Sequence, residues 1–440
     1  MAIRAQTPRA PRKKAEAAPA RKSQRDLASL TPKTENSQLK PKNTSTPTNA
    51  RPKGLPRNGK AVFDRAKQVP RLITVGQLDT LIGALVREGY EVIGPTARDG
   101  AITYERVKSV ADLPAGWTDE QEPGRYRLQR RDDQALFGYS QGVQSWKKHL
   151  HAADVRLWAA EKENGSFRIL NNEPDAISPK AFLGVRACEL AAIAKQDRVL
   201  LEDKYHDPFY ASRRENAFII AVQCSASAAT CFCASVGSGP KVTGGFDLLV
   251  TELIDTDNHR FLVEAGSARG AQFLSELEAA PASPHDMQAA EAAITSAAQQ
   301  QRQIDTQGLK EFLYENFENP QWDKLSARCL SCANCTMVCP TCFCTTVEDV
   351  TDITGLHAER WRRWDSCFTL NFSYIHGGSI RNSTKSRYRQ WMTHKLAAWT
   401  DQFGELGCVG CGRCITWCPA AIDITDEIRT MREGLRHADS

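Results

Sequence analysis

The sequence predicts an α/β or α+β domain followed by a mostly helical domain, with a disordered basic tail in front of both. Apolar residues recur with strand and with helix spacing between residues 66 and 285. Eleven of the fifteen cysteines then lie between Cys329 and Cys418, in a segment whose spacing is compatible with helices. Because 440 residues exceed what one hydrophobic core usually serves, we expect at least two folded domains.

Residues 1–65 are rich in Pro, Ala, Lys, Arg, Thr and Asn and have almost no large apolar side chains. The first 60 residues carry 15 Lys/Arg against 3 Asp/Glu, although the whole chain has a net charge of only +5, so the body is mildly acidic. A segment of this composition cannot bury enough surface to offset its ordering entropy. We predict a disordered tail; the alternatives are a targeting presequence or an arm that touches nucleic acid.

Residues 66–285 are predicted to form the α/β domain. Leu78, Leu81, Ile82, Leu85 and Val86 follow helical spacing, which predicts an amphipathic helix over residues 75–88. The remaining elements are predicted strands at 218–222, 248–253 and 261–263 and predicted helices at 188–195 and 271–277.

A helical connector is predicted over residues 286–320, because residues 287–304 are rich in Ala and Gln. The mostly helical domain is predicted over residues 321–430, with a helix-compatible stretch at 388–399. No stretch approaches the roughly 18 apolar residues of a membrane-spanning helix, and the N-terminus lacks the apolar core of a secretory signal. We therefore expect a cytoplasmic protein that does not enter a membrane.

Two cysteine runs in the helical domain share the pattern C-x2-C-x2-C-x3-C-P. The first motif covers residues 329–339 and is followed by Pro340; the second covers residues 408–418 and is followed by Pro419. In a long chain of this type, cysteines point to metal or redox chemistry rather than to disulfides. This spacing is typical of ferredoxin-type [4Fe–4S] clusters, whose fourth cysteine ligates the other cluster.

The expected ligands are therefore crossed between the motifs, and the helical domain is predicted to be a two-cluster ferredoxin domain. Two zinc knuckles are the alternative, but they typically use two cysteine pairs with a longer gap. The three leading cysteines of the first motif and the last cysteine of the second are the expected ligands of cluster 1, and we call them the first set. The other four are the expected ligands of cluster 2, and we call them the second set. The first set is Cys329, Cys332, Cys335 and Cys418, and the second set is Cys408, Cys411, Cys414 and Cys339.

Seven cysteines lie outside the two sets. Four belong to the α/β domain and could hold a third iron–sulfur cluster or act as small buried hydrophobes. This third set is Cys188, Cys224, Cys231 and Cys233. Cys342, Cys344 and Cys367 follow the first motif and could shield a cluster or supply ligands to an extra one. The Trp and Arg residues of 361–364 are expected to pack and shield rather than to bind nucleic acid.

No residues with an identifiable catalytic pattern accompany the cysteines. Gly237 and Gly239 lack the third glycine of a dinucleotide fingerprint, and no P-loop, Ser-His-Asp arrangement or paired carboxylates can be identified. We therefore predict no catalytic residues. A flavin site in the α/β domain remains an alternative.

Several motifs together resemble one protein family. They are Cys339-Pro-Thr-Cys342-Phe-Cys344, Arg360-Trp-Arg-Arg-Trp-Asp-Ser-Cys367, the second motif, Gly184-Val-Arg-Ala-Cys188-Glu-Leu, Thr230-Cys-Phe-Cys233 and the segment 245–253. Over about residues 70–430 the chain resembles the iron–sulfur (beta) subunit of soluble sulfhydrogenases and is equally similar to the iron–sulfur subunit of anaerobic sulfite reductases.

The resemblance implies an electron relay within a larger oxidoreductase. Such a protein passes electrons between a flavin- and NAD(P)-binding partner and a catalytic partner of the nickel–iron hydrogenase or siroheme sulfite reductase type. The alternative is a stand-alone ferredoxin-like reductase whose α/β domain binds a substrate or a flavin. A third hypothesis is a nucleic-acid-binding metalloprotein that uses the basic tail.

Overall fold

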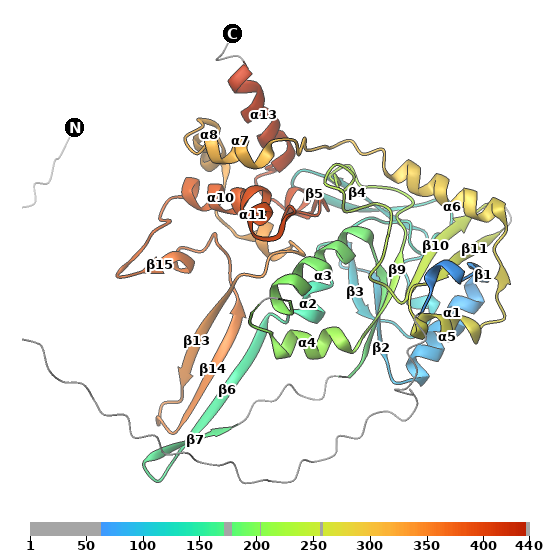
Figure 1. Ribbon diagram of the computed structural model, residues 1–440, viewed down its shortest axis with the longest axis horizontal. Helices are drawn as coiled ribbons and strands as arrows, with labels where there is room; N and C mark the ends of the chain where they lie inside the picture. The colour runs from blue at the N-terminus through green and yellow to red at the C-terminus, as the bar shows by residue number, and fades with distance from the viewer. Residues whose placement is uncertain (1–62, 171–177, 203, 256–257, 437–440) are drawn as a thin grey trace, which may run out of the picture. The chain divides into compact units, whose positions relative to one another are not determined.

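The fold is built around an eight-stranded mixed sheet in the first half of the chain (Figure 1). A computed structural model describes residues 63–170, 178–202, 204–255 and 258–436. The tail predicted over residues 1–65, with the nucleic-acid hypothesis that rests on it, lies almost wholly outside these residues. In spatial order the strands are β12 (Ala280–Pro281), β1 (Arg71–Thr74), β11 (His259–Ala265), β10 (Leu248–Ile254), β9 (Ala217–Val222), β8 (Lys180–Val185), β2 (Glu91–Arg98) and β3 (Ala101–Arg106).

The centre of the sheet is parallel and its edges are antiparallel. The strands β10, β9, β8 and β2 run parallel to one another, while β11, β1 and β12 on one side and β3 on the other pair antiparallel. The central strand β9 is buried along its whole length. Side chains that alternate along it enter two different cores, as expected when helices cover both faces.

One face is covered by α1 (Val75–Arg87) and α5 (Ala268–Ser275), and the other by α2 (Lys147–Leu150), α3 (Ala187–Leu200) and α4 (Pro208–Glu215). The helix α1 begins at a capping box, in which Thr74 Oγ1 accepts from the Gln77 amide and the Gln77 side chain accepts from the Thr74 amide. The helix predicted at 75–88 is confirmed, and Leu78, Leu81, Ile82 and Leu85 are buried on the sheet. Val86, expected on the same stripe, is 46% exposed.

The predicted strands at 218–222, 248–253 and 261–263 are confirmed as β9, β10 and β11. The predicted helices at 188–195 and 271–277 correspond to α3 and α5. In the predicted connector, α6 (Pro284–Ala297) ends seven positions before Ile304, the last residue of the Ala- and Gln-rich stretch. The helix α7 (Leu309–Glu315) follows. The described residues all belong to one compact unit, and the boundaries between the predicted domains stay predictions.

We call residues 63–285 the sheet region and residues 321–430 the cluster region. The cysteines of the cluster region are carried by short helices and loops around one apolar core. Its helices are α8 (Gln321–Arg328), α9 (Asn334–Met337), α10 (Thr384–Thr393), the π-helical turn η4 (His394–Ala398), α11 (Trp399–Phe403), α12 (Arg413–Thr416) and α13 (Ile424–Arg436).

A β-hairpin between the two motifs was not predicted. It consists of β13 (Thr345–Thr351) and β14 (His357–Trp364), and β14 pairs antiparallel with β6 (Asp154–Glu163) of the sheet region. With β7 (Ser166–Leu170) these strands form a second, four-stranded sheet, visible as the orange and green strands that run together in Figure 1. The segment 361–364 therefore lies in a strand, where Lys147 Nζ stacks on the Trp364 ring at 4.0 Å. No helix of the described part is long and apolar enough to cross a membrane.

Candidate iron–sulfur site

The two motifs adopt the same backbone conformation. The third and fifth residues of each motif have left-handed φ angles, +51° and +66° at Ser331 and Ala333 and +58° and +77° at Gly410 and Gly412. Side chains other than glycine rarely adopt this conformation, since it costs about 1–2 kcal/mol per residue. A short helix then begins in each motif, α9 after Ala333 and α12 after Gly412. Ser331 and Ala333 adopt it where the second motif has glycine, which indicates that the loop shape itself is needed.

Backbone amides in these loops point at cysteine sulfurs. The Ser331 amide donates to Cys329 Sγ at 3.4 Å, and the equivalent Gly410 amide donates to Cys408 Sγ at 3.3 Å. The Ile422 amide donates to Cys418 Sγ at 3.4 Å. Hydrogen bonds to ligand sulfurs are one of the means by which proteins adjust iron–sulfur clusters.

The four cysteines of the first set line one cavity. Cys418, the last cysteine of the second motif, lies there with the three leading cysteines of the first motif, and Cys414 also reaches the cavity wall. Burial, with the neighbouring Cys329, Cys418 and Cys332, holds the pKa of Cys335 well above its usual range. The other walls of the cavity are apolar and include Phe368, Tyr388, Trp391, Ile422 and Ile424.

The second set gathers deeper in the protein. Cys408, Cys411 and Cys339 are each at most 9% exposed. Burial raises the pKa of Cys414 well above its usual range, and the nearby Cys408, Cys411 and Cys339 add to the effect. Cys339 is thus next to the three leading cysteines of the other motif.

The residues fit two cubane clusters better than zinc ions. Zinc needs its thiolates about 2.3 Å from a single ion, whereas a cubane spreads four thiolates over its corners. Among the described residues, no three His, Cys, Asp or Glu side chains converge closely enough to hold one metal ion. When bound, such clusters would supply one-electron transfer, and the cysteines would hold them between apolar walls that limit access of water.

The third set lies at the carboxyl ends of the parallel strands. Cys188 follows β8 and Cys224 follows β9, while Cys231 and Cys233 lie in the loop after β9. Burial raises the pKa of Cys231 well above its usual range, with contributions from Cys233 and Cys224. Cys188 and Cys233 pack against Cys411 of the second set, and the Gln300 amide donates to Cys233 Sγ at 3.1 Å. Cys188, Cys231 and Cys233 therefore adjoin Cys411 of the second set, while Cys224 lies beside Arg186.

The second motif contacts the loop after β9 through backbone and side-chain atoms. The Phe232 amide donates to the Gly410 carbonyl at 2.8 Å, and Thr230 Oγ1 lies 2.8 Å from Thr416 Oγ1. A Cβ atom on Gly412 would lie only 2.5 Å from the Thr230 carbonyl oxygen. Glycine is thus required here both by φ and by the close approach of two chains.

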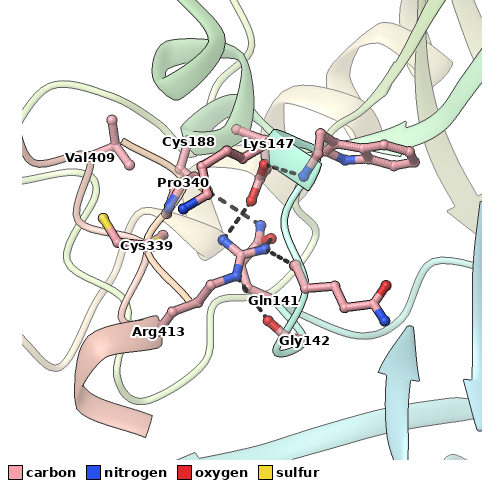
Figure 2. A network of polar contacts seen from close by, with 12 residues as sticks. Gln141, Gly142, Lys147, Cys188, Cys339, Pro340, Val409 and Arg413 are labelled. Atoms are coloured by element: carbon pink, nitrogen blue, oxygen red, sulfur yellow. Dashed lines mark hydrogen bonds and ion pairs between the residues drawn. The ribbon is translucent and has the colours of Figure 1, made fainter. Parts of the chain in front are cut away.

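Arg413 of the second motif inserts into the sheet region. Its guanidinium pairs with Glu189 at 2.6 Å and donates to the Gly142 carbonyl at 2.9 Å and to the Gln141 side chain at 2.8 Å (Figure 2). Arg413 and Glu189 are fully buried. Sequence reasoning did not single out this pair, because its two members lie far apart in the chain.

The three cysteines after the first motif take part in two thiol pairs, one of which includes Cys339 of the motif itself. Cys342 is hydrogen-bonded to Cys339, and Cys344 is hydrogen-bonded to Cys367. The hydrogen bond from Cys367 lowers the pKa of Cys344 to about 7. Lys395, another residue without a sequence signal, lies against Cys339 and Cys342.

Comparison with known proteins agrees with this geometry. Residues 328–422 match the family described as "4Fe-4S dicluster domain". The chain is 33% identical over 358 residues to the sulfhydrogenase 2 subunit beta of Pyrococcus furiosus, which covers 80% of this chain and 95% of the relative. No solved structure matches the chain. The similarity extends far beyond the cysteine motifs, and the chain therefore belongs to the family of sulfhydrogenase beta subunits, iron–sulfur proteins of electron transfer.

Proposed function

We propose that the chain relays single electrons through two [4Fe–4S] clusters whose ligands are crossed between the motifs. The observation that carries this proposal is the position of Cys418, which lines one cavity with Cys329, Cys332 and Cys335. The neighbours of Cys414, among them Cys339, support the complementary assignment of the second set.

A single substitution tests the crossing. Cys418→Ala should damage the cluster held by Cys329, Cys332 and Cys335 and leave the other cluster's signal intact in electron paramagnetic resonance (EPR) spectra of anaerobically purified protein. Cys339→Ala is the matched control and should have the opposite effect. If either variant instead loses the cluster held by the three leading cysteines of the motif in which the substitution lies, the ligands are not crossed.

We also propose a third cluster held by Cys188, Cys224, Cys231 and Cys233. The proximity of Cys233 and Cys224 to Cys231, whose pKa they help to raise, supports it, and so does the position of the four residues at and after the carboxyl ends of parallel strands. The full-length protein should then contain about twelve irons instead of about eight. Cys231→Ser together with Cys233→Ser should remove about four irons; an unchanged iron content would indicate buried structural thiols.

The proposed partners are a flavin- and NAD(P)-binding protein and a catalytic protein of the nickel–iron hydrogenase or siroheme type. The relative is itself named as one subunit of a sulfhydrogenase. We also propose a cytoplasmic location, because cysteines that bind iron–sulfur clusters rather than form disulfides suit a reducing compartment.

Gentle isolation from the native cell should recover these partners in a defined ratio. The alternative, a stand-alone reductase, predicts that the cluster-replete chain alone oxidises a nicotinamide and reduces an acceptor at normal enzyme rates. That result would replace the relay.

A further inference from the structure

Lys395 places a buried ammonium group directly against the sulfurs of the second site. Its side chain comes from the π-helical turn η4 and is only 6% exposed. Nζ lies 3.3 Å from Cys339 Sγ and 3.7 Å from Cys342 Sγ, and it donates to Thr341 Oγ1 at 2.9 Å.

The backbone around Lys395 is arranged to hold this position. Residues 394–398 form a π-helical turn between α10 and α11, a rare element that is frequent at functional sites. Thr341, which accepts from Nζ, donates in turn to the Gly407 carbonyl at 2.8 Å. The ammonium is thus fixed between the residue that follows Pro340 and the residue that precedes Cys408.

The charge of Lys395 has no carboxylate partner among the described residues. A buried ammonium without a counter-ion is costly, and such groups are normally paired. The atoms that the ammonium contacts are the neutral oxygens of Thr341 and Gly407 and the sulfurs of Cys339 and Cys342, and Cys339 belongs to the second set. Its counter-charge is therefore sulfur.

The first site has no equivalent group among the described residues. The cavity of the first set has apolar walls, and the guanidinium of Arg387 donates to Ser331 Oγ at 3.3 Å and to the Arg381 carbonyl at 3.0 Å, with no hydrogen bond to a cysteine sulfur among the described residues. The two sites thus differ in the charge placed on their ligand sulfurs, and net charge and hydrogen bonds to the sulfurs help set the reduction potential of a cluster.

We propose that Lys395 is a positioning residue that raises the reduction potential of the cluster held by Cys408, Cys411, Cys414 and Cys339. An added electron makes that cluster more negative, and the fixed ammonium stabilises the added charge. The electron arrives from a protein partner and leaves to another, so Lys395 exchanges no proton or bond. This inference rests on the proposed crossed clusters.

The test is an EPR-monitored redox titration of the full-length chain carrying Lys395→Met. At the wild-type midpoint potential of the second cluster, its ratio of reduced to oxidised form should fall at least tenfold, which is 59 mV for one electron. The first cluster should titrate as in the wild type. Lys395→Arg should restore most of the loss, because it keeps the charge.

Lys195→Met is the matched control. Lys195 is equally buried, but its ammonium pairs with Glu405 at 2.6 Å, and no hydrogen bond links it to a cysteine sulfur in the described part. This variant should leave both potentials unchanged. Unchanged potentials in Lys395→Met, with the iron content of the wild type, would overturn the role of Lys395 while leaving the two clusters in place.

A second measurement covers the case in which Lys395→Met loses the second cluster. In wild-type protein labelled with ¹⁵N-lysine, hyperfine spectroscopy should detect a nitrogen coupled to the reduced second cluster and none coupled to the first. Absence of this coupling would overturn the inference. Failure of the proposed clusters is recognised separately, by an iron content below about eight in the wild type.

Discussion

Arg413 and Glu189 form an ion pair that water does not reach, at the contact between the second motif and helix α3. The pair is compatible with a stable fold only while both side chains are present, because removing one leaves the other as a buried charge without a partner. The other hydrogen bonds of the Arg413 guanidinium go to Gln141, Gly142 and Gln144. The stability of the second loop therefore depends on a segment almost 270 positions earlier in the chain.

We predict that Arg413→Met lowers the free energy of unfolding by about 3–5 kcal/mol. Anaerobic denaturant titration with a fluorescence probe measures the change. The double variant Arg413→Met/Glu189→Leu should recover part of the loss, because no charge is left buried. Lys241→Met, which breaks the exposed pair with Glu291, should cost at most about 1 kcal/mol. A similar small cost for Arg413→Met would contradict the prediction.

His151 is a second buried group with consequences for stability. It is 2% exposed, and neither ring nitrogen has a hydrogen-bond partner within the described part. Burial, together with the charges of Arg362 and Lys147, lowers the pKa of His151 to about 3. The folded protein therefore holds this imidazole neutral.

The sign of the pH effect follows from that shift. As the pH falls below about 6.5, the unfolded chain binds a proton at this position and the folded chain does not, so stability present above pH 6.5 is lost progressively toward pH 3. At pH 5.5 the loss from this one group is about 1.4 kcal/mol. His151→Phe should remove this part of the pH dependence, seen as a smaller drop in denaturation midpoint between pH 7.5 and 5.5. An identical drop in both proteins would contradict the assignment.

At the scale of elements, the two cysteine loops provide an internal comparison. They share one backbone conformation, but Gly412 stands in the second loop where Ala333 stands in the first. The second loop lies against the Thr230 carbonyl, so only there does a Cβ atom collide with the backbone of another segment.

We predict that Gly412→Ala destabilises the contact between the second loop and residues 230–233 and reduces the yield of the second cluster. The left-handed φ alone costs about 1–2 kcal/mol, and the collision adds to it. Ala333→Gly is the matched control and should change the unfolding free energy by no more than about 1 kcal/mol. Iron content and the two EPR signals distinguish the outcomes; equal behaviour of the two variants would contradict the role given to the contact.

Local patterns predicted most elements of the sheet region. The strands β9, β10 and β11 follow from short runs of apolar side chains, and the helix α1 follows from the 3.6-residue period of its apolar side chains. The hairpin β13–β14 could not be predicted from local patterns, because most of its residues are exposed or half-buried and its partner strand β6 lies about 200 positions away. Strand pairing over such distances is fixed by tertiary contacts rather than by local sequence.

The same limit applies to the site. Cysteine spacing predicted the duplicated motifs, because the ligands of a cluster lie close together in the sequence. Lys395 and Arg413 could not be predicted, since a lysine or arginine is usually exposed and only the folded structure shows what it is buried against.

At the scale of the whole described unit, the two sites differ in their access to solvent. Cys332 of the first set is exposed, and Leu330 beside it is 67% exposed. Cys408, Cys411 and Cys339 of the second set are buried, and the loop of the sheet region packs on Gly410 and Gly412 of the second motif. A relay needs at least one cluster near the surface, because electron transfer to a partner requires a short distance, and the first site meets this need.

We predict that aqueous oxidants attack the first cluster before the second. When the full-length, reduced protein is mixed with ferricyanide, the EPR signal of the cluster held by Cys329, Cys332, Cys335 and Cys418 should disappear faster, since the anion reaches Cys332 but not the buried sulfurs. In Gly412→Ala protein the covering loop is displaced, so the remaining second cluster should lose its protection and the two rates should converge. If the wild-type second cluster is oxidised first by direct attack, with a rate proportional to ferricyanide concentration, then the buried site has its own path to solvent. The surface near Leu330 would in that case no longer be the expected point of contact with a redox partner.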